Sequence, residues 1–385
     1  MNILFVTHYT GLGGANIAML NLIRQYKKRN IGTYVIMPEG SKGLREKLED
    51  LEIEYAQIRM PWWVGDGEEG SLKSWKRYLS NFRGALEICP YVRKWRIDII
   101  HTNSTVVAAG LLAARMTRRL HVWHLREDLS NYGWKFCLND KKVKKWFHNS
   151  DRVIVISKAC ERIYEKYLDL EKTVLIYDGA QIDSPKEVPV LEDGVFHMLY
   201  LGGMSLSKGY QHILEALVLL KQRTEKRFRL WMPGCRENGR ANKELEEFIE
   251  VHRLEEAIEP MEYMDREQLD QFRYGMDLFI MASSKEMFGL VTVEAMLSGV
   301  PVVASDTGAN PELIRNGENG YLYPYGSAKA LAEKIQEIME TEDLGNVIEQ
   351  ARAEAQERFS MQSCAEQTID IYRGILKNSD MGYRC

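Results

Sequence analysis

Apolar positions in the first half of the chain form short runs rich in β-branched residues, separated by longer stretches where apolar residues recur every three or four positions. Such runs are typical of buried strands, and such stretches of amphipathic helices. Helices are predicted near residues 15–29 and 105–116, after 37 and after 157, with an irregular segment before 98. Strands are predicted at 2–7, 33–37, 53–58, 98–103, 121–125 and 153–157. The alternation indicates βαβ units in one open parallel sheet.

A second alternating series follows residues 178–194, which contain two prolines and little periodicity and are therefore predicted to link two domains. Its strands are predicted at 197–202, 228–232, 259–263, 278–283 and 300–305. A last helix is predicted over 361–377, with Ser360 as its N-cap. The pattern thus predicts an α/β protein with two Rossmann-like sheets in tandem.

The composition agrees with a soluble enzyme, because 45% of the 385 residues are hydrophobic and 28% are charged. The most apolar stretch, residues 106–116, is shorter than the roughly 20 residues of a membrane span, and no signal peptide is expected. Six cysteines are scattered without a close pair, which predicts reduced thiols and a cytoplasmic location.

Charge is divided unevenly, with a formal +8 over residues 1–190 and −12 over residues 191–385. Residues 134–147 interleave five lysines with aromatic residues, and a further aromatic pair, Trp62 and Trp63, follows Pro61. We expect peripheral contact with the inner face of an anionic membrane. The alternative is a solvated helix face whose aromatic side chains lie in the core. Nucleic-acid binding is disfavoured, because the chain is acidic overall and contains no recognition module.

Two loops of the second half follow predicted strands, where parallel sheets bind ligands. Residues 202–209 carry Lys208 in a glycine-rich loop at a helix start, which is suited to a phosphate. Residues 283–290 carry Glu286 and Gly289 and lead into a helix that contains Glu294. Each feature also has a structural alternative. Residues 202–209 would be a glycine turn with a solvated lysine, Glu286 would interact with the helix dipole, and Glu294 would form a salt bridge. A glycosidase pair is disfavoured, since eight helical residues rise about 12 Å, against roughly 5 to 9.5 Å for hydrolytic carboxylates.

The spacing of Glu286 and Glu294 resembles the paired-glutamate motif of the retaining GT-B glycosyltransferases, and residues 283–305 resemble family 4, also called group 1. Further agreement, over nearly the whole chain, comes from residues 13–15, 155–158, 208–209, 307–308 with Glu312, and 319–322. The resemblance implies two Rossmann-like domains that face each other across a cleft. Residues 1–182 would form the acceptor-side domain, 183–358 the nucleotide-sugar domain, and 359–385 a helix that returns to the first domain.

The resemblance also implies roles for single residues. Glu294 would bind the donor ribose, Glu286 would contact the transferred sugar, and Lys208 would hold the diphosphate. Backbone amides and close-approach glycines would complete the donor site; these are Phe288, Gly289 and Leu290 in the second domain, and Gly13 and Gly14 in the first. Gly203 departs from the family, which commonly has an arginine there, so Arg236 or Arg240 is expected to substitute for the missing cation.

On the acceptor side, the resemblance makes His124 the histidine that touches the donor sugar. Arg126 and Glu127 would lie near it and bind acceptor or phosphate, and His101, Asn103 and Ser104 are weaker candidates. A histidine on a sheet is alternatively a structural residue. No acidic metal-binding motif and no convincing ligand spacing occur in the sequence, so transfer without a metal or other cofactor is expected.

The sequence therefore predicts a retaining glycosyltransferase that moves a sugar from a nucleotide-diphosphate sugar to a hydroxyl of a glycan, lipid-linked or small-molecule acceptor, in cell-surface polysaccharide synthesis. One alternative is a catalytically silent sugar-nucleotide binder, motivated by Gly203. A second is an NAD-dependent oxidoreductase, motivated by the glycine loop at 11–16. Asn16 replaces the third glycine of the dinucleotide pattern, and Glu39 lies beyond the offset of its acidic residue, which disfavours that alternative.

Overall fold

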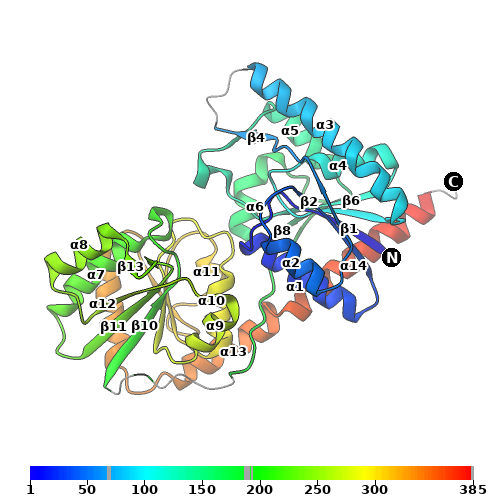
Figure 1. Ribbon diagram of the computed structural model, residues 1–385. Helices are drawn as coiled ribbons and strands as arrows, with labels where there is room; N and C mark the ends of the chain where they lie inside the picture. The colour runs from blue at the N-terminus through cyan, green and yellow to red at the C-terminus, as the bar shows by residue number, and fades with distance from the viewer. Residues whose placement is uncertain (67–70, 186–190, 192–193, 383–385) are drawn as a thin grey trace. The chain divides into compact units, whose positions relative to one another are not determined.

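The computed structural model describes residues 1–66, 71–185, 191 and 194–382 (Figure 1). The chain forms two compact units, of which the first comprises residues 1–179 with the C-terminal segment from 360 onward, and the second comprises 180–359. Parts of the expected linker, residues 186–190 and 192–193, lie outside the described residues, as does Cys385. None of the helices in the described ranges is long and apolar enough to cross a membrane.

The first unit is built on a seven-stranded parallel sheet of order β3-β2-β1-β5-β6-β8-β9. The strands are β1 (Asn2–Val6), β2 (Gly32–Pro38), β3 (Tyr55–Ile58), β5 (Ile99–Thr102), β6 (Leu120–Leu125), β8 (Arg152–Val155) and β9 (Thr173–Leu175). All six strands predicted for this half are confirmed. The seventh, β9, was missed because it is only three residues long and half-buried.

Helices α1 (Gly14–Lys28), α2 (Gly43–Asp50), α4 (Ala109–Thr117), α5 (Asp140–His148) and α6 (Lys158–Tyr164) connect these strands. The prediction of an irregular segment before residue 98 is wrong, because α3 (Ser71–Lys94) fills most of it. Apolar residues lie on the outer face of α3 as well as on its packed face, which obscured the helical period. A short antiparallel pair, β4 (Val64–Gly65) with β7 (Lys135–Phe136), completes this side.

The apolar side chains of α5 that were expected to meet a membrane lie in the core. Val143, Trp146 and Phe147 are buried, and so is Trp63, while the lysines of α5 point to solvent. Trp63 stacks on Trp123 and Trp146, with ring centroids 5.4 and 5.0 Å apart. For these buried residues the structural alternative is therefore the correct one, whereas Trp62, Trp134 and Phe136 are half-buried.

The second unit contains a six-stranded parallel sheet of order β14-β11-β10-β15-β16-β17. Its strands are β10 (Val195–Tyr200), β11 (Arg227–Pro233), β14 (Ile258–Met261), β15 (Leu278–Met281), β16 (Val302–Ser305) and β17 (Tyr321–Tyr323), and a hairpin joins β12 (Arg236–Glu237) to β13 (Arg240–Ala241). The helices are α7 (Tyr210–Lys221), α8 (Lys243–His252), α9 (Arg266–Arg273), α10 (Leu290–Ser298), α11 (Asn310–Leu313), α12 (Ala328–Glu340) and α13 (Gly345–Arg358). The five predicted strands are confirmed, and β17 is additional.

The C-terminal helix α14 (Met361–Gly382), red in Figure 1, packs on α1 of the first unit, as predicted. Cys364, Ile369 and Tyr372 share one hydrophobic core with Phe5 and Tyr26. The first unit is thus completed by the last part of the chain.

Candidate active site

The two predicted donor loops lie at the topological switch point of the second sheet. One follows β10 and the other follows β15, which are neighbouring strands with connections that run in opposite directions. Ser284 N donates to Ser207 O at 2.9 Å and joins the loops. Gly209 has φ +73°, and a Cβ there would overlap Ala282 O, so only glycine lets the loops approach this closely. Such switch points are where open α/β sheets bind ligands.

Lys208 and Glu286, which the sequence analysis assigned to the two donor loops, meet at this edge. Lys208 Nζ donates to Glu286 Oε2 at 2.8 Å, and Ser283 Oγ donates to the same oxygen at 3.2 Å. The ammonium is well exposed and the carboxylate is partly exposed. The pair therefore presents a cation and an acceptor of hydroxyl hydrogen bonds side by side.

The loop after β16 fixes the backbone of Glu286. Ala309 N donates to Glu286 O at 2.8 Å, and Thr307 Oγ1 donates to Ser283 O at 2.8 Å. Gly308 has φ +58°, and a Cβ there would overlap the Glu286 backbone. The Thr307–Gly308 motif thus acts through Glu286.

Gly289, at φ +101°, is the N-cap of α10. The backbone N–H groups in the first turn of a helix have no intrahelical acceptor and point outward, and together with the helix dipole they attract anions. Phe288 is buried, with its ring centroid 5.8 Å from that of Phe359, so only its backbone is suited to a ligand. Leu290 is partly exposed.

Glu294 lies in a cluster of arginines that the sequence analysis missed. Arg266 donates to its Oε1 at 2.6 Å and Arg273 to its Oε2 at 3.0 Å, and Arg273 also binds Asp270 at 2.9 Å. Burial raises the pKa of Glu294, while the two arginines oppose the rise. Each carboxylate oxygen therefore already has one partner, and Arg266 is the more exposed of the two. No motif marks α9, so only the fold reveals these contacts.

Gly203 adopts φ +55°, and a Cβ there would meet nothing within 4 Å. The position has room for a side chain, although the backbone is left-handed. Of the two substitutes expected, Arg236 is paired with Glu259 at 3.3 Å, and Arg240 lies exposed on β13.

In the first unit, Asn16 organises the glycine loop after β1. Its side chain donates to Tyr9 O at 3.0 Å and Gly11 O at 2.8 Å, and accepts from Thr7 Oγ1 at 2.6 Å. Gly13 is the N-cap of α1, and a Cβ there would overlap the Tyr9 hydroxyl. The third glycine of a dinucleotide site is thus replaced by a buried side chain that braces the loop. A Cβ at Gly14 would meet nothing.

The other predicted residues of the first unit form a polar network beneath this edge. His101, His124 and Asn103 are 0% exposed, Ser104 is buried, and Arg126 forms a buried ion pair with Asp178. Asn103 Oδ1 accepts from Arg126 Nε at 3.1 Å. Because strand side chains alternate between faces, His124 points into the unit, and the ring expected to touch the donor sugar is sealed from solvent. His101, Asn103 and Arg126 are buried in the same way.

The hydrogen bonds of this network fix the protons on both rings. Arg126 can only donate, and its NH2 group lies 3.2 Å from His124 Nδ1, so this nitrogen accepts. His101 Nε2, 3.2 Å from the same atom, must therefore donate, and the Tyr372 hydroxyl donates to His101 Nδ1 at 2.6 Å. Burial and the charge of Arg126 hold the pKa of both histidines well below the usual range.

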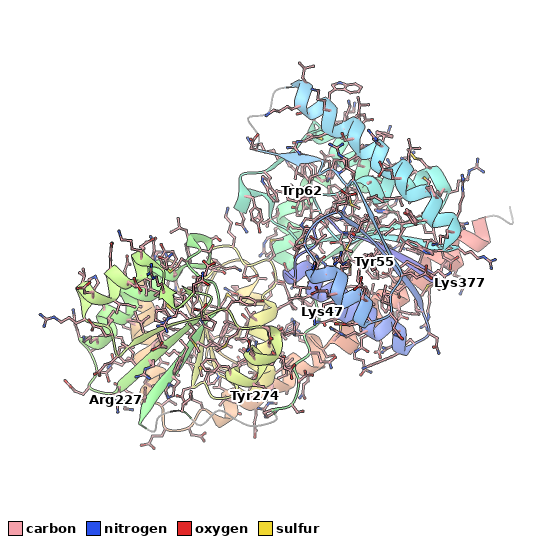
Figure 2. The ribbon with its side chains drawn as sticks, in the orientation of Figure 1. Lys47, Tyr55, Trp62, Arg227, Tyr274 and Lys377 are labelled. Carbon is pink, nitrogen blue, oxygen red and sulfur yellow. The ribbon has the colours of Figure 1, made fainter. Side chains whose placement is uncertain are left out.

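Glu127 and His8, at the carboxyl ends of β6 and β1, form a largely buried pair whose side chains are 12% and 11% exposed, and His8 was missed by the sequence analysis. Glu127 Oε2 accepts from Thr105 N at 2.7 Å, while Oε1 lies 3.6 Å from His8 Nδ1. Trp62, labelled in Figure 2, donates to His8 O at 3.1 Å. Burial lowers the pKa of His8, although Glu127 opposes the change. His8 lies two residues after β1, in the loop at the carboxyl end of that strand, which is the signal that could have identified it.

Residues 12–184 match the family model described as Glycosyltransferase Family 4, and residues 182–357 match the model described as Glycosyl transferases group 1. This chain belongs to the group 1 glycosyltransferases. An uncharacterised glycosyltransferase of Methanocaldococcus jannaschii is 25% identical over 72% of this chain and 75% of that protein. The O-antigen chain mannosyltransferase B of Escherichia coli is 32% identical over 60% of this chain, and the match spans 57% of that enzyme.

Solved structures show the same GT-B fold. A glycosyltransferase of Rickettsia africae superposes with a TM-score of 0.80 at 21% identity, over 98% of this chain and 99% of that one. The Anabaena protein HepE in complex with UDP gives a TM-score of 0.77 at 23% identity, over 97% of this chain and 100% of that one. Within the described part of this glycosyltransferase, no three His, Cys, Asp or Glu side chains gather in a way that could hold a metal ion.

Proposed function

We propose that this group 1 glycosyltransferase transfers a sugar from a nucleoside-diphosphate sugar to a hydroxyl acceptor, with retention of anomeric configuration and without a metal. The observation that carries the proposal is the Lys208–Glu286 pair at the sheet edge, beside the amides that open α10. The ammonium and the helix terminus would stabilise charge on the departing diphosphate, and Glu286 would hold hydroxyls of the sugar.

The reaction breaks the bond between the anomeric carbon and the diphosphate oxygen. The acceptor oxygen bonds to that carbon from the same face, and its proton passes to the departing phosphate. Because the departing phosphate accepts the proton, this route requires no side chain as general base. The chain would instead contribute positive charge beside this phosphate.

A panel of UDP-, GDP-, ADP- and CDP-sugars in a thermal-shift assay tests donor binding, with UDP-sugars first because HepE binds UDP and UDP-glucose. A ligand at 100 times its Kd adds about 2.7 kcal/mol of stability. Lys208→Met should remove most of the shift and lower kcat by about 100-fold. Lys243→Met, on exposed α8, is the control. An unchanged shift in Lys208→Met would contradict the proposed diphosphate contact.

On the acceptor side, we propose that His8 and Glu127 bind the attacking hydroxyl. A neutral His8 with its Nδ1 proton directed at Glu127 leaves Nε2 as a hydrogen-bond acceptor. His8→Phe should raise the acceptor KM by about 10-fold or more, since one hydrogen bond to the acceptor is lost. The donor thermal shift should stay unchanged, and a lost donor shift would contradict the assignment. The polysaccharide-building relatives support a glycan or lipid-linked glycan as acceptor.

The silent sugar-nucleotide binder remains the second candidate, because Gly203 leaves the cradle without its usual arginine. It requires a donor shift with no release of nucleoside diphosphate in the presence of any acceptor. Release of nucleoside diphosphate that depends on an added acceptor would exclude it.

A further inference from the structure

Helix α3 carries an exposed apolar stripe. Leu72, Trp75, Leu79 and Leu86 are 79%, 60%, 53% and 62% exposed. At about 100° per residue, these four positions fall within an arc of about 60° on one side of the helix. The opposite face, with Ala85, Ile88 and Val92, is buried and packs on α4. The stripe is therefore not needed to hold α3 in the fold, and an apolar row of this kind marks an interaction site.

Cations border the stripe. Helix α3 contains six basic residues and one acidic residue, Glu87, which lies 3.5 Å from Arg83. Lys76, Arg83 and Lys94 project next to the apolar row by the same helical geometry. The surface therefore combines an apolar centre with positive flanks.

A groove of about 490 Å³ lies on the other side of the row, between α3, α4 and α5. Figure 1 shows these three helices together at one edge of the first unit. Tyr78 and Trp146 line it with ring centroids 5.7 Å apart, and Arg115, Lys142 and Lys145 supply cations without any carboxylate in the lining. An apolar floor with a cationic rim matches an anionic headgroup attached to an acyl chain.

We propose that α3 and α5 dock this enzyme on an anionic lipid bilayer. The stripe of α3 lies in the acyl boundary, and the lysines of α5 with Arg83 and Arg115 pair with headgroup phosphates. Charge complementarity selects this occupant. A protein partner would have to offer an acidic ring around an apolar strip, whereas an anionic bilayer offers both at any point. The docking residues belong to the first unit and include none of Lys208, Glu286 and His8, so substitutions in this surface leave the residues of the proposed chemistry unchanged.

The test is cosedimentation of the full chain with two kinds of vesicle. One contains phosphatidylcholine alone, and the other also contains about 30 mol% phosphatidylglycerol, whose negative charge attracts basic segments. Binding is expected only with phosphatidylglycerol, and added salt should weaken it. The double variant Trp75→Ser with Leu79→Ser, and separately Lys142→Glu with Lys145→Glu, should each lose about 10-fold in bound fraction. Val251→Ser with Lys243→Glu, exposed on α8, is the matched control.

Brominated acyl chains give a second readout, because they quench tryptophan at the depth of the tails. Quenching should fall in Trp75→Phe while vesicle binding persists, and what remains should come from Trp146 in the groove. Equal circular dichroism, melting temperature and donor thermal shift would show that the variants fold and that the donor site is unaffected. The proposal is overturned if the wild-type chain ignores anionic vesicles, if the stripe variant binds as well as wild type, or if the chain forms a lipid-free dimer that the stripe variant dissolves.

Discussion

At the scale of single residues, Gly203 stands where the family commonly has an arginine, and its backbone geometry decides whether an arginine could be accommodated there. Its Cβ position is open, whereas its φ of +55° costs a non-glycine residue about 1 kcal/mol. A charge-assisted hydrogen bond between an arginine and a phosphate contributes about 1.5 to 3 kcal/mol. The balance favours an arginine here whenever a diphosphate is bound.

Gly203→Arg should therefore tighten donor binding by about 3- to 10-fold and raise turnover, as measured by calorimetric titration and by release of nucleoside diphosphate. Gly203→Gln, which carries the same backbone cost without the charge, should weaken binding slightly. Equal affinities for the two variants would disprove a role for the missing cation.

Tyr372 is the other residue with a sharp expectation, since it donates to a buried ring nitrogen of His101. Tyr372→Phe leaves that acceptor without a partner and should lower the free energy of unfolding by about 1 to 3 kcal/mol. Urea denaturation measures the change. Tyr274→Phe is the control, because the Tyr274 hydroxyl (labelled in Figure 2) donates to Asp183 O at an exposed site. A loss in the control equal to that in Tyr372→Phe would refute the argument from burial.

At the scale of elements, the proposed donor site depends on loops that contact one another. Gly308→Ala would push the loop after β16 against the Glu286 backbone. We expect kcat/KM to fall by about 100-fold, because the carboxylate must be held within a fraction of an ångström. Gly317→Ala shares a positive φ, +81°, but meets nothing, and should change activity less than about 3-fold. Similar losses in both variants would mean that backbone strain, rather than the displacement of Glu286, is responsible.

The strands and the donor loops were predictable because their signals are local. Apolar runs mark buried parallel strands, and the glycines and charges that follow them mark ligand loops. The Lys208–Glu286 contact follows from adjacency of β10 and β15. Arg266 and Arg273 were not predictable, since their meeting with Glu294 depends on how α9 packs on α10. The burial of His124 was not predictable, because sequence does not show which face of an inner strand opens to solvent, and α3 was missed because its outer face is apolar.

The whole molecule should lose stability as the pH falls below about 6.5. His101, His121 and His124 are buried, and burial lowers the pKa of all three, that of His121 to about 3. The histidines of the unfolded chain take up protons near pH 6.5, whereas the buried rings of the native chain do not. The free energy of unfolding therefore falls by about 1.4 kcal/mol per pH unit below that value for each of these rings. The raised pKa values of Glu294 and Asp178 partly offset this, since the native carboxylates take up protons before the unfolded ones.

Urea midpoints measured from pH 8 to pH 5 should therefore fall steadily below pH 6.5. His121→Asn should flatten the slope, whereas His252→Gln, at an exposed position, should leave it unchanged. A midpoint that does not vary over this range would rule out neutral buried histidines.

The helix that closes the first unit follows the whole second unit in the sequence, so it is synthesised after that unit. On the ribosome, the contiguous second unit can assemble as soon as residue 359 has emerged, whereas the amino-terminal sheet waits for α14 with its face toward α1 uncovered. The second unit can thus complete its fold before the first unit, although the first unit begins earlier in the chain. A chain terminated after residue 359 would release a complete second unit joined to an incomplete, aggregation-prone first unit.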